Sequence, residues 1–228
     1  MSKKVAFFDV DGTIFRSSLL IELVETMVAE QVFPVTAIQE YRKELDAWQN
    51  REGTYDDYIN AVVASYMKHI KGVYYGDFAD IGRMVVAEQG KRVYRYTRDL
   101  IKSLKADNYF IVAISQSPKT VLDEFCYHYG FDKAYGRIYE IGPSDNFTGA
   151  VIDEAYITNK ANVVSRVFEV EDVVPEDSVG VGDTEGDIPL LESVEQPICF
   201  NPNRRLYEYA KGKGWEVVVE RKDVIYEL

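Results

Sequence analysis

Short apolar segments alternate with amphipathic segments through most of the chain, and this alternation limits the possible folds more than any other feature. We expect strands at residues 4–10, 109–115, 137–141, 148–151, 178–181, 197–200 and 215–219, and helices at 93–106, 119–129, 159–169, 188–193 and 204–211. Strands connected through helices pair in parallel, with right-handed crossovers. The first strand is apolar at nearly every position, as strands are when helices cover both faces of a sheet. The sequence therefore predicts an α/β fold with a doubly wound, mostly parallel sheet.

Residues 17–92 interrupt this alternation with helical periodicity and no convincing strand. Apolar residues recur there at spacings of three and four, which is typical of amphipathic helices. We expect helices after Ser17, from Pro34 through Trp48, from Tyr55 through Ile70 and over residues 78–87. The sequence therefore predicts a core formed by residues 1–16 and 93–228, with residues 17–92 inserted as a helical bundle.

The charge balance excludes several classes of partner. The chain carries 38 acidic residues against 26 lysines and arginines, for a formal net charge of -12. Such a charge repels nucleic acids and anionic membrane surfaces, so we expect neither as a partner. The apolar run before Asp9 is too short for a secretory signal, and no segment approaches the ~18 apolar residues of a membrane span. Cys126 and Cys199 lack metal-ligand spacing, and we expect free thiols in a reducing cytoplasm. No pattern indicates an oligomeric state.

Polar residues follow the ends of several expected strands. Asp9 and Asp11 follow the first strand, Ser115 and Gln116 follow the second, and Asp183 and Asp187 follow the strand that begins at Ser178. Lys160 begins an expected helix and can face the same crevice. In open α/β sheets, ligands bind beyond the carboxyl ends of the strands. We therefore expect these side chains to converge on one edge of the sheet.

The carboxylates of this group indicate a divalent cation. Asp9 and Asp11 stand two residues apart on a strand, so their side chains leave the backbone on the same side. Together with Asp183 and Asp187 they repel one another unless a cation or a proton intervenes. Such an oxygen-rich set suits Mg²⁺, and the lack of histidine or cysteine disfavours zinc.

Donors for a phosphoryl group stand beside these carboxylates. Lys160 and the hydroxyl groups of Thr13 and Ser115 can bind phosphoryl oxygens. A carboxylate can attack phosphorus to form an aspartyl-phosphate, and a neighbouring acid can protonate the leaving oxygen. The residues therefore favour phosphoryl chemistry.

The first motif of the haloacid dehalogenase superfamily, in its phosphatase form, resembles the segment Asp9-Val10-Asp11-Gly12-Thr13. Its other three motifs are similar to Ser115, Lys160 and the segment from Gly182 to Asp187, which follow in the same order. The resemblance implies Mg²⁺-dependent hydrolysis of a phosphomonoester, with Asp9 as nucleophile and Asp11 as general acid and then base. It implies further that Ser115 and Lys160 hold the phosphoryl oxygens. The resemblance implies a metal site formed by the carboxylates of Asp9 and Asp183 and the backbone carbonyl of Asp11. Asp187 would support either the water shell of the metal or Lys160.

The insert of residues 17–92 resembles the helical cap of the branch that includes phosphoserine phosphatase. A cap of this kind implies a small soluble substrate, and Thr13, Arg16 and Gln116 are candidates to bind it. Ser18 stands where phosphoserine phosphatases carry a glutamate that meets the substrate amine. The sequence therefore predicts a substrate class and not one compound.

Two other functions fit parts of the pattern. A phosphotransferase would pass the same aspartyl-phosphate to an acceptor hydroxyl instead of water. A receiver-type switch also uses aspartate, serine or threonine, and lysine around Mg²⁺. Receiver domains, however, are about half this length and lack the inserted bundle and the second carboxylate of Asp11, which disfavours the switch.

Overall fold

The computed structural model describes residues 2–228 and contains one eight-stranded sheet. The strands are β1 (Lys3–Phe8), β2 (Phe110–Pro118), β3 (Lys133–Ile141), β4 (Phe147–Ile152), β5 (Val173–Gly182), β6 (Gln196–Phe200), β7 (Glu216–Arg221) and β8 (Val224–Glu227). Their order is β4-β3-β2-β1-β5-β6-β7-β8, and only the edge strands β4 and β8 pair antiparallel with their neighbours. The prediction of a doubly wound, mostly parallel sheet is confirmed. The short edge strand β8 was not predicted.

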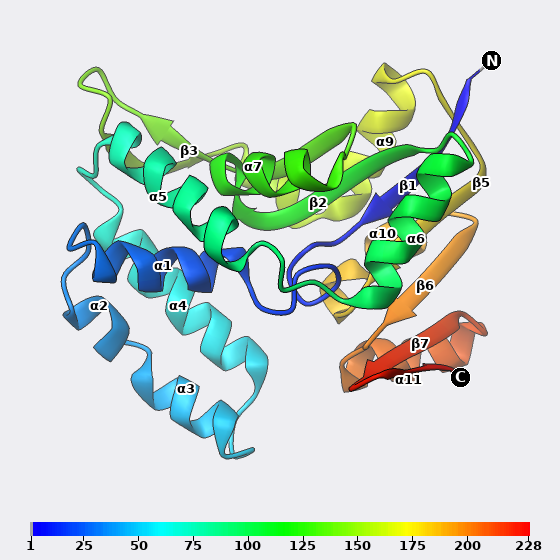
Figure 1. Ribbon diagram of the computed structural model, residues 1–228, viewed down its shortest axis with the longest axis horizontal. Coiled ribbons are helices and arrows are strands. Elements are labelled where there is room, and N and C mark those ends of the chain that lie inside the picture. The colour runs from blue at the N-terminus through cyan, green and yellow to red at the C-terminus, as the bar shows by residue number, and fades with distance from the viewer. Residues whose placement is uncertain (1) are drawn as a thin grey trace.

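Helices cover both faces of this sheet, which explains the continuous apolar sequence of β1. Val5 and Phe7 pack on one face and Ala6 and Phe8 on the other, all with no exposed surface. The first face is covered by α8 (Glu154–Thr158), α9 (Lys160–Val170), α10 (Ile188–Leu191) and α11 (Arg204–Lys213). The second face is covered by α6 (Arg95–Ala106) and α7 (Lys119–Tyr129) (Figure 1). The strand ends between these layers position the polar residues described below.

The inserted segment is helical, as the periodicity predicts. Its helices are α1 (Leu19–Ala29), α2 (Thr36–Gln39), α3 (Arg42–Gln49), α4 (Tyr55–His69) and α5 (Tyr75–Gln89). In Figure 1, α1 to α4 form a group beside the sheet, and α5 packs against α7. The single helix expected from Pro34 through Trp48 is wrong, because the chain breaks it at Tyr41. The Tyr41 ring is fully buried, with its centroid 5.9 Å from that of Tyr58, so tertiary packing overrides the local periodicity.

The chain enters and leaves the helical segment at neighbouring points. Phe15 pairs with Val93 in an isolated bridge, and the Arg16 N–H donates to the Arg92 carbonyl at 2.8 Å. The helical segment also contacts the β3–β4 hairpin, where the Phe78 and Phe147 rings lie 4.9 Å apart. The helical segment is therefore anchored both at its junction with the sheet and at the β3–β4 hairpin. In residues 2–228, none of the helices combines the length and apolar character that a membrane crossing requires.

Candidate active site

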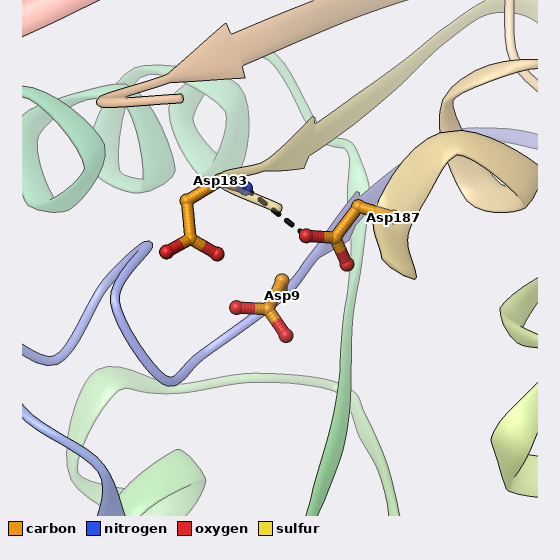
Figure 2. A group of neighbouring side chains, drawn as sticks. All are labelled: Asp9, Asp183 and Asp187. Atoms are coloured by element: carbon orange, nitrogen blue, oxygen red, sulfur yellow. Dashed lines mark hydrogen bonds between the residues drawn. The ribbon is translucent and has the colours of Figure 1, made fainter. Parts of the chain in front are cut away.

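Three aspartates meet at the carboxyl ends of β1 and β5. Asp9 directly follows β1 and Asp183 directly follows β5, and these strands are neighbours in the sheet. Asp187 ends the short 3₁₀ turn Glu185–Asp187. Figure 2 shows the three carboxylates turned toward one another. One oxygen from each lies within 4.8 Å of the others. The structure therefore brings together residues far apart in the sequence.

Two glycines permit this close approach. Gly12 has a φ of +88°, and a Cβ at this position would lie 2.2 Å from Oδ2 of Asp183. A Cβ on Gly182 would lie 2.4 Å from the Cβ of Asp187. Any side chain at either position would displace a carboxylate, so both glycines are required by the geometry of the site.

Lys160 links two of the aspartates. As the first residue of α9 it is buried, and its Nζ lies 2.5 Å from Oδ1 of Asp9 and 2.5 Å from Oδ1 of Asp187. Burial alone would lower the pKa of Lys160, but the carboxylates of Asp187 and Asp9 outweigh it and raise the pKa. The lysine is therefore a fixed cation beside the Asp9 carboxylate.

Both oxygens of Asp187 are engaged within the protein. Oδ1 accepts from Lys160, and Oδ2 accepts from the backbone N–H groups of Asp183 and Thr184, each at 3.0 Å. This arrangement fixes the turn after β5 and the position of Lys160. Of the two roles expected for Asp187, the structure shows the contact with Lys160.

Asp11 lies within a separate hydrogen-bond network. Its Oδ2 accepts from Oγ of Ser115 at 2.5 Å and from Oγ of Ser117 at 2.9 Å. Its Oδ1 accepts from the backbone N–H of Leu19, the first residue of α1, at 2.6 Å. Asp11 therefore connects the end of β2 with the start of the helical segment.

The electrostatic environment of Asp9 and Asp183 favours a bound cation. Among residues 2–228, Oδ2 of Asp9 is a buried oxygen with no hydrogen-bond partner. Burial and the nearby carboxylates of Asp187 and Asp11 raise the pKa of Asp9 to about 7, although Lys160 opposes this shift. Burial, Asp9 and Asp187 likewise raise the pKa of Asp183. A hard cation such as Mg²⁺ would relieve the repulsion between these clustered carboxylates and would bind the unpaired oxygen.

These shifts predict that protein stripped of metal loses stability as the pH rises from about 4 to about 7. The folded state binds protons at Asp9 and Asp183 more tightly than the unfolded chain does, so ionisation of these groups favours unfolding. Lys160 contributes nothing to this trend, because lysine keeps its charge up to about pH 10. Melting temperatures in excess chelator should be higher at about pH 5.5 than at about pH 8.

The variant Asp183→Asn should reduce the difference in melting temperature between about pH 5.5 and about pH 8. Its matched control is Asp107→Asn, which changes the net charge equally at an exposed position at the end of α6. If the two variants respond alike, general charge repulsion explains the trend and the buried cluster does not.

The other predicted substrate contacts are divided between the site and its surroundings. Gln116 lines the cavity above the aspartates, whereas Thr13 and Arg16 do not. The buried Thr13 hydroxyl donates to Oδ1 of Asp183 at 3.3 Å. The guanidinium of Arg16 lies 5.6 Å from the centre of the Tyr94 ring. Thr13 therefore contacts a carboxylate of the site, and Arg16 packs on an aromatic ring outside the cavity.

The cavity itself has a volume of about 230 Å³ and is shared between the sheet edge and the helical segment. From α4 it is lined by Tyr55, Asp56, Ile59, Asn60 and Val63, and from β3 by Arg137 and Tyr139. Sequence reasoning missed most of these residues. The spacing of Asp56, Ile59 and Val63 marks one face of α4, but a mixed polar and apolar face does not by itself indicate a cavity.

Comparison with known proteins agrees with this fold and site. Residues 6–192 match the model of the haloacid dehalogenase-like hydrolase family. The chain is 27% identical over 126 residues to the inhibition of morphological differentiation protein of Streptomyces azureus, which covers 55% of this chain and 46% of that protein. It is 23% identical over 235 residues to histidinol-phosphatase of Neisseria meningitidis serogroup C, covering 95% and 98%.

A solved structure of a phospho-aspartyl intermediate analogue of phosphoserine phosphatase superposes with a TM-score of 0.64 and 19% identity. It covers 98% of this chain and 96% of that one. The chain thus has the fold of phosphoserine phosphatase, while it spans less than half the length of the Streptomyces relative. Because the family model matches most of the sequence, the chain belongs to the haloacid dehalogenase-like hydrolase family.

Proposed function

We propose that this protein is a phosphatase that hydrolyses a small-molecule phosphomonoester through an aspartyl-phosphate on Asp9, with Mg²⁺ as cofactor. The observation that carries the proposal is the state of Asp9. Its carboxylate is buried, Lys160 fixes one oxygen, and the other oxygen has no partner among residues 2–228. The histidinol-phosphatase relative and the phosphoserine phosphatase structure support phosphoester hydrolysis.

In the first step, a carboxylate oxygen of Asp9 attacks phosphorus and the bond from phosphorus to the leaving oxygen breaks. Asp11 in its acid form donates a proton to that leaving oxygen, and Ser115 and Ser117 orient its carboxyl group through the contacts at Oδ2. In the second step, Asp11 takes a proton from water and the water oxygen attacks phosphorus. The bond from phosphorus to Asp9 breaks, and inorganic phosphate leaves.

The donor set fits a magnesium ion held by Asp9 and Asp183, with the Asp11 carbonyl as a further ligand. When bound, the ion would neutralise the clustered carboxylates and withdraw charge from the phosphoryl oxygens. Lys160 remains in place throughout and offsets the charge beside Asp9, so we assign it to the phosphoryl site. Asp187 positions Lys160 and the turn that carries Asp183, which is a supporting role.

We further propose that residues 17–92 act as a cap over residues 1–16 and 93–228. Helix α4 supplies one wall of the cavity, so substrate must lie between the helical segment and the sheet edge. The volume of about 230 Å³ is below the ~300–1,000 Å³ of pockets for drug-sized ligands. Small phosphomonoesters should therefore be turned over, and phosphoproteins should not.

The buried free thiols of Cys126 and Cys199 agree with a cytoplasmic location.

A screen of phosphate release tests this function. Purified protein with Mg²⁺ is incubated with sugar phosphates, phosphorylated amino acids, nucleotides and phosphopeptides. The buffer contains no alcohol that could accept a phosphoryl group. We expect inorganic phosphate from small soluble esters and little from phosphopeptides. Product that depends on the concentration of an added alcohol would instead show a phosphotransferase. Preference for phosphopeptides would contradict the cap.

A further inference from the structure

An arginine that the mechanism does not use, with most of its side chain buried, lies in the wall of the cavity. Arg137 belongs to β3, and its backbone stands in register with Pro118 of β2, just beyond Ser115. Only 11% of its side chain is exposed, and it lines the same cavity as Asp9 and Gln116. Arginine is seldom buried unless its charge is paired, so its partners are informative.

The guanidinium of Arg137 is only partly paired. Nη2 donates to Oε1 of Gln116 at 2.7 Å, and Nη1 lies 3.6 Å from Oε1 of the exposed Glu154. The buried Nε has no hydrogen-bond partner within residues 2–228. A buried donor without an acceptor is costly. The contact of Nη1 with Glu154 is longer than a hydrogen bond, so the guanidinium keeps donor capacity for a ligand oxygen in the cavity.

The contact with Gln116 places this cation near the general acid. Gln116 follows Ser115, whose hydroxyl donates to Oδ2 of Asp11. In the proposed mechanism Asp11 protonates the leaving oxygen. Asp11 and Arg137 line the same cavity, so we place Arg137 on the leaving-group side of the site.

The charges of the cavity make Arg137 the natural partner of an anion on the leaving group. Five aspartates line the cavity, namely Asp9, Asp11, Asp56, Asp183 and Asp187. The other lining cation, Lys160, is paired with two of them at 2.5 Å. Among the described lining residues, Arg137 is thus the cation with the weaker pairing, since its one carboxylate neighbour is the exposed Glu154 at 3.6 Å. A second anionic group on the substrate would be repelled elsewhere in the cavity.

On the basis of the proposed phosphatase function, we propose that Arg137 binds a carboxylate on the leaving group, so that the preferred substrates are phosphomonoesters of small hydroxy acids. The parallel N–H groups of a guanidinium match the two oxygens of a carboxylate. The small volume of the cavity favours a carboxylate a few bonds from the phosphoester over a second phosphate on a larger sugar. Gln116 orients the guanidinium and is a positioning residue.

Two matched pairs of substrates test this assignment. O-phosphoserine differs from O-phosphoethanolamine by a carboxylate, and 3-phosphoglycerate differs from glycerol 3-phosphate by a carboxylate in place of a hydroxymethyl group. We expect kcat/KM to favour the carboxylated member of each pair. In Arg137→Gln this preference should fall about ten- to a hundredfold, because a hydrogen bond to a charged group is lost. Arg137→Lys, which keeps the positive charge but lacks the parallel N–H groups of the guanidinium, should retain an intermediate preference.

The matched control is Arg83→Gln. Arg83 is an exposed arginine of α5 that lies outside the cavity, so this variant removes the same charge and should keep the preference. Equal losses for both members of a pair in Arg137→Gln would overturn the inference, since they would indicate contact with the phosphoryl group or a structural role. The inference would also be overturned if the kcat/KM of the wild-type protein did not favour the carboxylated member of each pair.

A measurement on the unmodified protein covers the case in which the variants do not fold. Glycerate should inhibit the hydrolysis of p-nitrophenyl phosphate at a concentration at least about tenfold lower than glycerol does. Equal inhibition by the two compounds would overturn the inference. Hydrolysis of p-nitrophenyl phosphate also separates the two proposals, because failure of the inference leaves this activity intact. Absence of this activity with Mg²⁺ present would instead refute the phosphatase function.

Discussion

The variant Asp9→Asn is expected to lose activity by about three orders of magnitude or more while it keeps its fold. The substitution preserves the size of the side chain but removes the negative charge that attacks phosphorus. It also removes a charged partner of Lys160, which lies 2.5 Å from Oδ1. Initial rates of phosphate release, measured with p-nitrophenyl phosphate and saturating Mg²⁺, check this expectation.

The variant Asp107→Asn is the matched control, because it makes the same chemical change at an exposed position away from the cavity. Circular dichroism and thermal melting establish that both variants fold. Intact-mass measurement excludes deamidation of the new asparagine back to aspartate. If Asp9→Asn of confirmed mass retains more than about a tenth of wild-type turnover, Asp9 is not the nucleophile.

The sheet and the group of aspartates could be predicted because the information for them is local. Near-continuous apolar runs identify buried strands, and Asp9 and Asp183 each come directly after such a run. The carboxyl ends of parallel strands share one edge, so the convergence of Asp9 and Asp183 follows from the fold class. That β1 and β5 are direct neighbours, which brings carboxylate oxygens of Asp9 and Asp183 within 4.8 Å of each other, depends on the strand order and has no local signal.

Arg137 illustrates why the wall of the cavity could not be predicted. In the sequence it is one residue of an expected strand, and a strand residue faces either the core or the solvent. Its burial depends on how β3 pairs with β2, and its access to the cavity depends on how α4 packs above the sheet edge. Arg16 shows the converse case. It stands close to the first motif along the chain, yet its guanidinium packs over Tyr94 outside the cavity.

Removal of divalent metal is expected to abolish turnover, and Mg²⁺ in excess over the chelator should restore it. Without a cation, the neighbouring carboxylates of Asp9 and Asp183 repel each other and the incoming phosphoryl group, as their raised pKa values indicate. Titration of Mg²⁺ into chelator-treated protein, followed by phosphate release and by melting temperature, measures both activity and binding. Mg²⁺ should raise the melting temperature of the wild type, because a ligand that binds the folded state stabilises it.

Two variants test which aspartates hold the ion. Asp183→Ala should weaken Mg²⁺ binding by about a hundredfold or more, since this carboxylate is turned toward Asp9 and its only hydrogen-bond donor within residues 2–228 is Thr13. The same variant should melt at a higher temperature than the wild type in chelator, because it relieves carboxylate repulsion. Asp187→Asn should weaken Mg²⁺ binding less than Asp183→Ala does, because Lys160 and two backbone N–H groups already occupy both of its oxygens. Full activity in excess chelator would refute the metal-dependent mechanism, and a larger loss of Mg²⁺ affinity in Asp187→Asn would make Asp187 a direct ligand.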